Sequence, residues 1–354
     1  MRAEIPEAPE LDVSLLLGFS FACRPDCGLC CYAEPRANLA ERSRLIQIAP
    51  NAQFIVRGSD QFLGARPNGG ACQFLTDNRC GVHGARPHPC REFPITVHIG
   101  ERLQATVVLS CPGVDPTRWL ARAGNAGDSD TVGLESELAA VRSRIDRTTR
   151  RRLEDVGRRR RKVVRVLESE GRWQDESEVR TALADSIPLP VDSDFPVEDP
   201  PSADRGLETL PLFYDGGGCP VAVASALGGW ELLRLDPGGA APESLGVIPP
   251  PERLPRAEPR ARALLEAYLG YWLKRDALFG AVHLDMLETD DGAPVDEWVA
   301  AELASVGATV LARADVRARW RRGPAEQLTF SDVWDGIRAT DQDLLDRPSW
   351  GERL

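Results

Sequence analysis

The sequence lacks several features that would assign it to a common class of protein. No apolar run approaches the roughly eighteen residues of a membrane helix, and the longest, residues 15–19, is interrupted by a glycine. The four histidines stand in no hydrolase motif, and no Gly-x-Gly-x-x-Gly joins a predicted strand to a predicted helix. These absences argue against a membrane span, a Ser-His-Asp hydrolase and a glycine-rich cofactor loop.

Basic residues outnumber acidic ones in only one segment of the sequence. The net charge is −11, and lysine is almost absent beside arginine. Basic residues exceed acidic ones in residues 119–172, by 14 to 9, whereas residues 173–354 carry 17 basic and 33 acidic side chains. Because phosphate neutralisation supplies most nucleic-acid affinity, a general nucleic-acid binder is not expected. Acidic Glu4, Glu7 and Glu10 stand where a secretory leader would be positive, which predicts a cytoplasmic protein.

What the sequence has in excess is cysteine near its beginning. Residues 1–120 hold eight of the nine cysteines, with many glycines and prolines, which predicts an irregular metal-binding module. We expect an amphipathic helical region at 121–185, a proline-rich acidic linker at 186–206 and a mixed C-terminal domain at 207–354. The predicted fold class is α+β.

Hydrophobic periodicity predicts the elements after the module. Apolar residues at three- and four-residue steps between 134 and 167, with one shift of phase, predict a long helix or a helix pair. Three short apolar runs separated by glycines predict a β-meander. The residues after 260 are predicted to be mainly helical. The runs are 210–214, 220–225 and 230–235, and the expected helices are 261–281, 296–305 and 331–345.

The cysteines themselves are the main candidate for a functional site. Four of them fall within nine residues, and the other four are dispersed; the eight are Cys23, Cys27, Cys30, Cys31, Cys72, Cys80, Cys90 and Cys111. Disulfides are disfavoured because a cytosolic chain keeps its thiols reduced and adjacent Cys30 and Cys31 would bridge each other poorly. Clustering in one third of the chain argues against unligated core cysteines. Metal binding is therefore predicted.

The sequence indicates metal binding more clearly than it indicates which metal is bound. One tetrahedral zinc takes four ligands, so eight thiolates would form two closed zinc sites or a thiolate-bridged pair. Neighbouring Cys30 and Cys31 cannot comfortably share one ion, whereas an iron–sulfur cluster accepts closely spaced thiolates. We predict an iron–sulfur cluster of the 4Fe-4S type, with zinc as the alternative. His83 and His88 are further candidate ligands, although eight cysteines already fill two sites.

Two arginines bracket one of the dispersed cysteines. Arg86 and Arg91 flank Cys90, and cationic donors there would offset the negative charge of a thiolate centre. They are therefore predicted to lie around the cofactor. The alternative is that both form ordinary surface ion pairs.

The spacing resembles that of the YkgJ-type cysteine-cluster family (CxxCxxCC), described as zinc- or iron-chelating domains. The similarity covers roughly residues 20–115, and its opening run has three residues between Cys23 and Cys27 where many members have two. His83 stands where a tyrosine is common. The matching positions are Phe21, Cys23, Cys27, Cys30, Cys31, Cys72, Phe74, Leu75, Cys80, Val82, Arg86, Pro87, Cys90, Arg91, Phe93, Pro94 and Cys111.

The resemblance implies a metal-binding protein whose partner is a metal ion or cluster, with a protein partner or substrate as a further expectation. The alternative is an S-adenosylmethionine-dependent protein lysine N-methyltransferase, because flagellin lysine-N-methylases have a similar layout of cluster first and helical region later. Residues 215–218 read as a hairpin turn rather than as its cofactor loop.

Three other features have simpler interpretations. The basic run 158–162 is flanked by apolar residues at helical spacing and diluted by acids, which indicates a solvated helix face. Cys219 is predicted to be buried filler in a strand. Arg275, at the end of an apolar helical stripe, could bind an anion.

Overall fold

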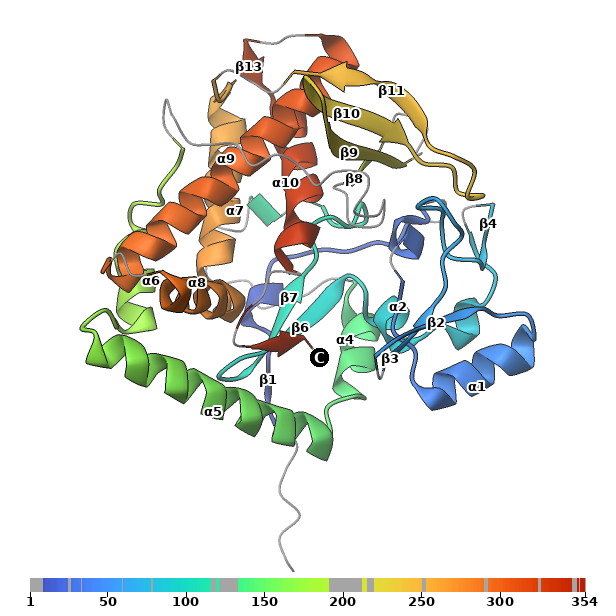
Figure 1. The fold of residues 1–354 in the computed structure, drawn as a ribbon, viewed down its shortest axis with the longest axis horizontal. Helices are drawn as coiled ribbons and strands as arrows, with labels where there is room; N and C mark the ends of the chain where they lie inside the picture. The colour runs from blue at the N-terminus through green and yellow to red at the C-terminus, as the bar shows by residue number, and fades with distance from the viewer. Residues whose placement is uncertain are drawn as a thin grey trace, which may run out of the picture.

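The structure is a computed structural model and describes most of the chain (Figure 1). The described residues are 9–24, 27–32, 34–58, 60–77, 79–115, 119–120, 133–190, 212–214, 220–249, 253–289, 292–323, 326–345, 349 and 351–353. Helices and several small sheets make the fold α+β, as the sequence predicts.

The cysteine-rich part consists of short elements. It contains β1 (Leu11–Asp12), η1 (Ser14–Leu16), η2 (Leu29–Tyr32), α1 (Leu39–Ile48), β2 (Phe54–Arg57), β3 (Asp60–Leu63), β4 (Leu75–Thr76), β5 (Arg79–Cys80), η3 (His83–Ala85) and α2 (His88–Glu92). β2 pairs with β3 and β4 with β5, each as an isolated hairpin. This confirms the predicted irregular module, since no large sheet or long helix organises the region among its described residues.

A four-stranded sheet lies between this module and the helices of the C-terminal part (Figure 1). Its central hairpin is β6 (Ile95–Ile99) and β7 (Leu103–Val107). β1 pairs with β7 in parallel, and β14 (Glu352–Arg353) pairs antiparallel with β6. Segments from both ends of the chain therefore flank one hairpin, and that hairpin leads into Cys111.

The predicted helical region is a helix pair followed by a third helix. α4 (Glu135–Arg142) and α5 (Arg147–Ser169) are separated at residues 143–146, where the apolar pattern shifts phase. Asp146 caps α5 by accepting a hydrogen bond from the Thr149 amide at 2.9 Å, which fixes the new start. α6 (Glu176–Ala184) follows.

The predicted β-meander is confirmed and has a fourth strand. β8 (Leu212–Tyr214), β9 (Pro220–Ala226), β10 (Gly229–Arg234) and β11 (Glu243–Ile248) form an antiparallel sheet in the order β11-β10-β9-β8. Gly229 has a φ of 154°, and a Cβ there would lie 2.3 Å from the Ile248 carbonyl oxygen. Only glycine fits so close an approach of two strands.

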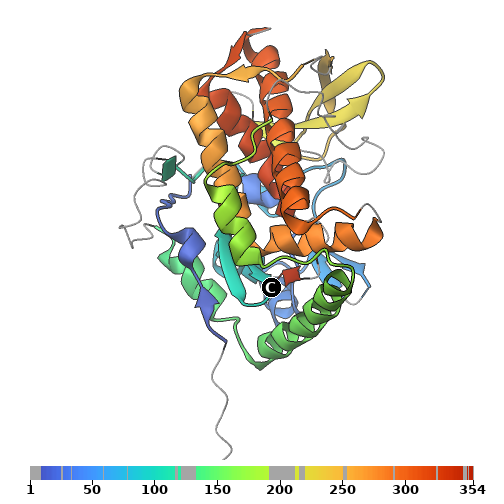
Figure 2. The ribbon, with the colours of Figure 1, turned by 90° about the vertical axis from the view of Figure 1, so that its left-hand side faces the viewer.

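The described residues of the C-terminal part form the helices α7 (Pro259–Leu273), α8 (Asp276–Glu288), α9 (Val295–Arg322) and α10 (Phe330–Leu345). The short strands β12 (Arg256–Ala257) and β13 (Gln327–Leu328) pair in parallel beside them. α9 packs along α10 and α7, and α6 contacts both α7 and α9 (Figure 2). The prediction of one helix over 261–281 was wrong, because the chain breaks at Lys274 and Arg275 between α7 and α8.

The largest hydrophobic core joins parts far apart in the sequence. It includes Leu16 and Phe19, the inner residues of β6 and β7, Val156 of α5, and the buried faces of α7 to α10. The division into parts at 120, 185 and 206 stays a prediction, and most of the expected linker, 191–206, lies outside the described residues. In the described part of the chain, every helix is too short or too polar to cross a bilayer.

A buried histidine predicts acid sensitivity of the fold. His283 is fully buried against Trp173 and Phe279, and this burial lowers its pKa to about 3 from an ordinary 6.5. Between these values the unfolded chain binds a proton that the folded chain does not, so stability falls as the pH falls. Lowering the pH from 7 to 5 should cost about 2 kcal/mol through this residue alone.

The measurement is urea unfolding of the wild type and of His283→Leu at both pH values. The variant should lose about 2 kcal/mol less than the wild type over that interval. Equal losses would show that His283 does not contribute to the acid sensitivity.

Candidate metal centre

The opening cysteine run follows a backbone pairing that ties it to a distant segment. Phe21 forms an antiparallel bridge with Val114, and the Ala22 amide donates to the Gly113 carbonyl at 3.0 Å. A Cβ on Gly113 would lie 2.6 Å from the Ala22 carbonyl oxygen, so a side chain there would push the segments apart. This pairing brings Cys23 beside Cys111, although 88 positions separate them in the sequence.

The same run turns sharply before it reaches its last two cysteines. The Cys27 amide donates to the Arg24 carbonyl at 3.3 Å, and the Cys31 amide donates to the Gly28 carbonyl at 2.9 Å. Gly28 has a φ of 61°, which favours glycine. η2 then carries Cys30 and Cys31, and their thiols are hydrogen-bonded to each other.

The dispersed cysteines lie on the short elements of the module. Cys72 bridges Ala65, Cys80 ends the β4–β5 hairpin opposite Leu75, and Cys90 lies in α2. Cys111 follows β7 on a tight turn in which the Val114 amide donates to its carbonyl at 3.1 Å. The eight described cysteines are all free, so the disulfide alternative finds no support among them.

One group of thiols forms around Cys31. The Cys72 amide donates to the Cys31 carbonyl at 2.6 Å, and both residues pack with Cys80 in a small cluster around Leu45 and Leu63. Its hydrogen bond to Cys30, burial, and the proximity of Cys72 and Cys80 raise the pKa of the Cys31 thiol. Burial raises the pKa of Cys90, with Cys30, Cys72 and Cys80 as its charged neighbours. We call Cys31, Cys72, Cys80 and Cys90 the Cys31 group.

A second group forms around Cys111. Burial raises the pKa of this thiol to about 12, and its thiol neighbours are Cys27, Cys30 and Cys23. Partial burial raises the pKa of Cys23, and the neighbouring Cys30 thiol raises it further. We call Cys23, Cys27, Cys30 and Cys111 the Cys111 group.

Cys30 lies where the two groups meet. Its pKa is lowered to about 7 by the hydrogen bond with Cys31, against a raising effect of burial and with help from Arg86. It also interacts electrostatically with cysteines of both groups. Cys30 is therefore the thiol that ionises readily near neutral pH, and a thiolate is the form that binds metal.

The thiols lie in one region of the fold but do not surround a common metal position. Within the described residues, no set of three or more Cys, His, Asp or Glu side chains has the geometry of a metal-ion site. Soft thiolate donors in this number suit zinc and iron–sulfur centres, so the chemistry of the residues fits either. Binding would have to draw the thiols inward, as in sites that form together with their metal.

The two predicted arginines lie in different surroundings. Arg86 is close enough to Cys23, Cys30 and Cys90 to lower the pKa of each, and its Nε donates to the His83 carbonyl at 3.1 Å. Arg91 instead contacts the His88 ring at 3.1 Å and lies 3.7 Å from a Glu41 carboxylate oxygen. Arg86 therefore has the position expected for offsetting thiolate charge, and Arg91 supports the surrounding structure.

Neither candidate histidine has a described contact with a cysteine thiol. His83 is exposed on η3. The His88 ring lies 3.7 Å from carboxylate oxygens of both Glu41 and Glu92, and burial lowers its pKa. Arg91 lies within 3.2 Å of both ring nitrogens, so the ring of His88 contacts charged side chains of the module.

A residue that the sequence interpretation missed is Glu41. It is 2% exposed, and its carboxylate accepts the His88 amide at 2.8 Å and the Asn38 amide at 2.9 Å. It therefore ties α1 to the start of α2, the helix that carries Cys90. The spacing Asn38-x-x-Glu41 is a capping-box pattern and could have revealed it.

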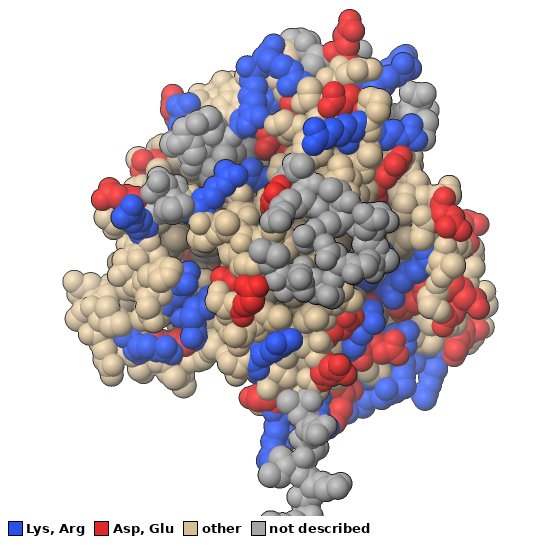
Figure 3. Space-filling view, turned by 180° about the vertical axis from the view of Figure 1, so that it is seen from behind, with Lys and Arg blue, Asp and Glu red and all other residues tan. Residues whose placement is uncertain are grey.

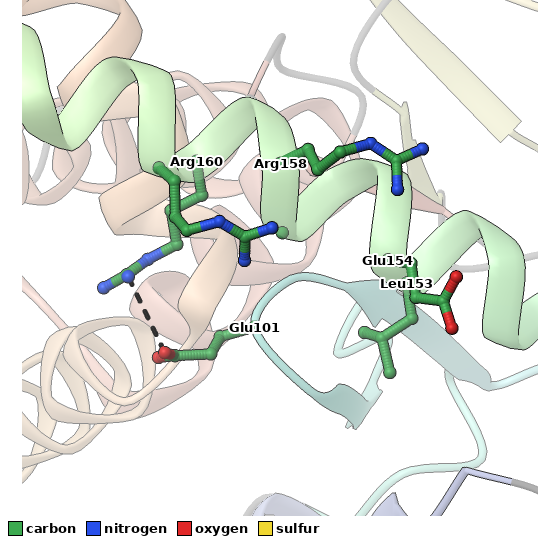
Figure 4. Close-up of a pocket in the computed structure, with 7 residues that line it drawn as sticks. Glu101, Leu153, Glu154, Arg158 and Arg160 are labelled. Atoms are coloured by element: carbon green, nitrogen blue, oxygen red, sulfur yellow. Dashed lines mark ion pairs between the residues drawn. The ribbon is translucent and has the colours of Figure 1, made fainter.

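The basic run on α5 is partly neutralised. Arg160 lies 3.6 Å from Glu101 (Figure 4). Arg160 also lies 3.0 Å from Glu176, and Arg158 pairs with Asp155. On the opposite face of the molecule from Figure 1, basic and acidic side chains are interspersed (Figure 3). This supports the interpretation of a solvated helix face. Residues 215–218 and Cys219 lie outside the described residues.

Arg275 does bind an anion, but the anion belongs to the chain itself. Its guanidinium is 1% exposed and lies 3.1 Å from the Asp341 carboxylate of α10. Its position between α7 and α8 explains why the helix predicted over 261–281 breaks there.

Comparison with known proteins agrees with this site. Residues 22–112 match the family model CxxCxxCC, described as "Putative zinc- or iron-chelating domain". The match spans the run from Cys23 to Cys111 and leaves the C-terminal helices outside it. No curated protein and no solved structure matches the chain.

Proposed function

We propose that this protein binds metal through eight cysteine thiolates arranged as two adjacent four-thiolate centres, the Cys31 group and the Cys111 group. The observation that carries the proposal is that the opening run contacts the dispersed cysteines at both of its ends. The last residue of the opening run, Cys31, lies against Cys72, and the last dispersed residue, Cys111, lies against the start of the run. Each group then has four thiols, the number that saturates a closed centre.

We further propose that each centre is an iron–sulfur cluster. Cys30 and Cys31 belong to different groups, which suits a short run whose last cysteine serves a second cluster, as in two-cluster ferredoxins. Arg86, near three of the thiols, would offset part of the negative charge. Bound clusters would supply electron transfer or a rigid scaffold; the residues named here would hold them.

Zinc is the second candidate, because two separate sets of four thiols also suit two closed tetrahedral sites. The methyltransferase alternative, like the cytoplasmic location and a protein partner, stays a prediction.

Anaerobic purification followed by an absorption spectrum and analysis of iron, sulfide and zinc tests the proposal. Two 4Fe-4S clusters would give a broad visible band with about eight iron and eight sulfide per chain. Colourless protein with about two zinc ions would replace clusters by zinc and leave the two centres standing. A chain without metal after reconstitution with either would refute the proposed function.

A further inference from the structure

The backbone that carries Cys111 is held by the C-terminal helices. We call residues 107–111 the Cys111 strand end. The Val107 amide donates to the Tyr271 hydroxyl of α7 at 2.8 Å, and the Leu109 amide donates to the Asp341 carboxylate of α10 at 2.7 Å. The Ser110 hydroxyl donates to the Arg338 carbonyl at 2.6 Å, and Arg338 Nε donates back to the Ser110 carbonyl at 3.3 Å. Four hydrogen bonds thus hold the residues immediately before Cys111 against α7 and α10.

The groups that make these bonds form one buried network. Asp341 is 0% exposed, and its second carboxylate oxygen accepts bonds from Arg275 at 3.1 Å and from the Tyr268 hydroxyl at 3.3 Å. Arg275 also reaches the Val107 carbonyl at 3.3 Å and lies over the rings of Tyr271 and Trp272. Because each buried polar group depends on the others for its partners, the network is disrupted as a unit.

The hydrogen-bond network and the thiols are connected through the backbone of Cys111. Cys111 is itself buried, and it is the member of the Cys111 group that comes from outside the opening run. Its backbone can move toward the other three thiols only if the Cys111 strand end moves with it. That strand end is fixed by α7 and α10, which the family match does not reach.

We propose that metal binding at the Cys111 group is coupled to the packing of α10, with Asp341 as the positioning residue that links them. This inference rests on the proposed function. Packing of α10 holds Cys111 in place for metal, and metal at the group in turn holds the strand end against α10. Coupling between two sites is reciprocal, so each event must affect the other by the same factor.

The first test is release of metal from the purified holoprotein to ethylenediaminetetraacetate. At equilibrium with the chelator, Asp341→Asn should hold the metal of one centre about tenfold less tightly than the wild type and leave the other centre unchanged. The matched control is Asp332→Asn, on the same helix. Asp332 is 1% exposed and ion-paired with Arg322, but it caps the far end of α10 near Thr329.

An unchanged metal affinity in Asp341→Asn, or an equal loss of affinity in Asp332→Asn, would overturn the link through Asp341 while leaving the proposed function intact. Wild-type protein without metal would overturn both.

The second test needs no variant, so it stands even if Asp341→Asn fails to fold. Hydrogen exchange at the Leu109 amide should quicken about tenfold when metal is removed from the wild type, because its acceptor on α10 is released. The Arg160 amide, in the middle of α5, should exchange at an unchanged rate. An unchanged rate at Leu109 would overturn the coupling.

Discussion

Replacing Cys31 and Cys27 together by alanine is expected to remove all of the bound metal, whereas replacing Cys31 and Cys80 together is expected to remove about half. The first pair takes one ligand from each group, and the second takes two from the Cys31 group. A centre with three thiolates is no longer closed, so one lost ligand per group is enough to release both. Metal per chain, measured after desalting, distinguishes the two results.

These pairs also separate the grouping proposed above from a grouping by sequence order. If the opening run formed one centre and the dispersed cysteines the other, Cys31→Ala with Cys27→Ala would spare half of the metal. Cys31→Ala with Cys80→Ala would then remove all of it. That reversed result would refute the two groups defined here. Cys219→Ala is the control, because spacing assigns Cys219 to neither group, and it should lose no metal.

Replacing Arg275 by methionine is expected to destabilise the fold by about 3–5 kcal/mol. The change leaves the Asp341 carboxylate buried without its cation and removes a guanidinium that lies 4.3 Å from the Trp272 ring centre. The measurement is the free energy of unfolding from urea titration of metal-bound protein at pH 7.

Arg262→Met on α7 is the matched control for this prediction. Arg262 forms an exposed ion pair with Glu266 four residues along the same helix. An exposed pair of this kind contributes about 0.5 kcal/mol at most. If Arg275→Met cost no more than Arg262→Met, the buried pair would not be a main support of the C-terminal helices.

Several of the regular elements after residue 133 are predictable from the sequence, because their patterns are local, whereas the strands and helices of residues 11–107 were not predicted. The shift of phase near residue 145 marks the start of α5, and the glycine-separated apolar runs mark β9 and β10. Leu264, Leu265 and Tyr268 recur on one side of α7 and are buried there, as the stripe predicts.

Two errors in the helices have a common cause in tertiary burial. α9 extends over Val295–Arg322, far beyond the predicted 296–305, and it is buried on several sides against α7, α8 and α10. A helix surrounded by protein lacks the polar face that makes a period visible. Arg275 breaks the helix predicted over 261–281, since its partner Asp341 is 66 residues away and no local pattern announces it.

The cysteines show the same division. The sequence alone gives the number and clustering of the cysteines. It also gives the match to the CxxCxxCC family model, because that match depends on residue type and spacing. The proposed division of the thiols into two groups depends on tertiary contacts. The bridge from Phe21 to Val114 and the bond from Cys72 to Cys31 join segments that are distant in sequence, and long-range backbone pairing follows from packing rather than from spacing.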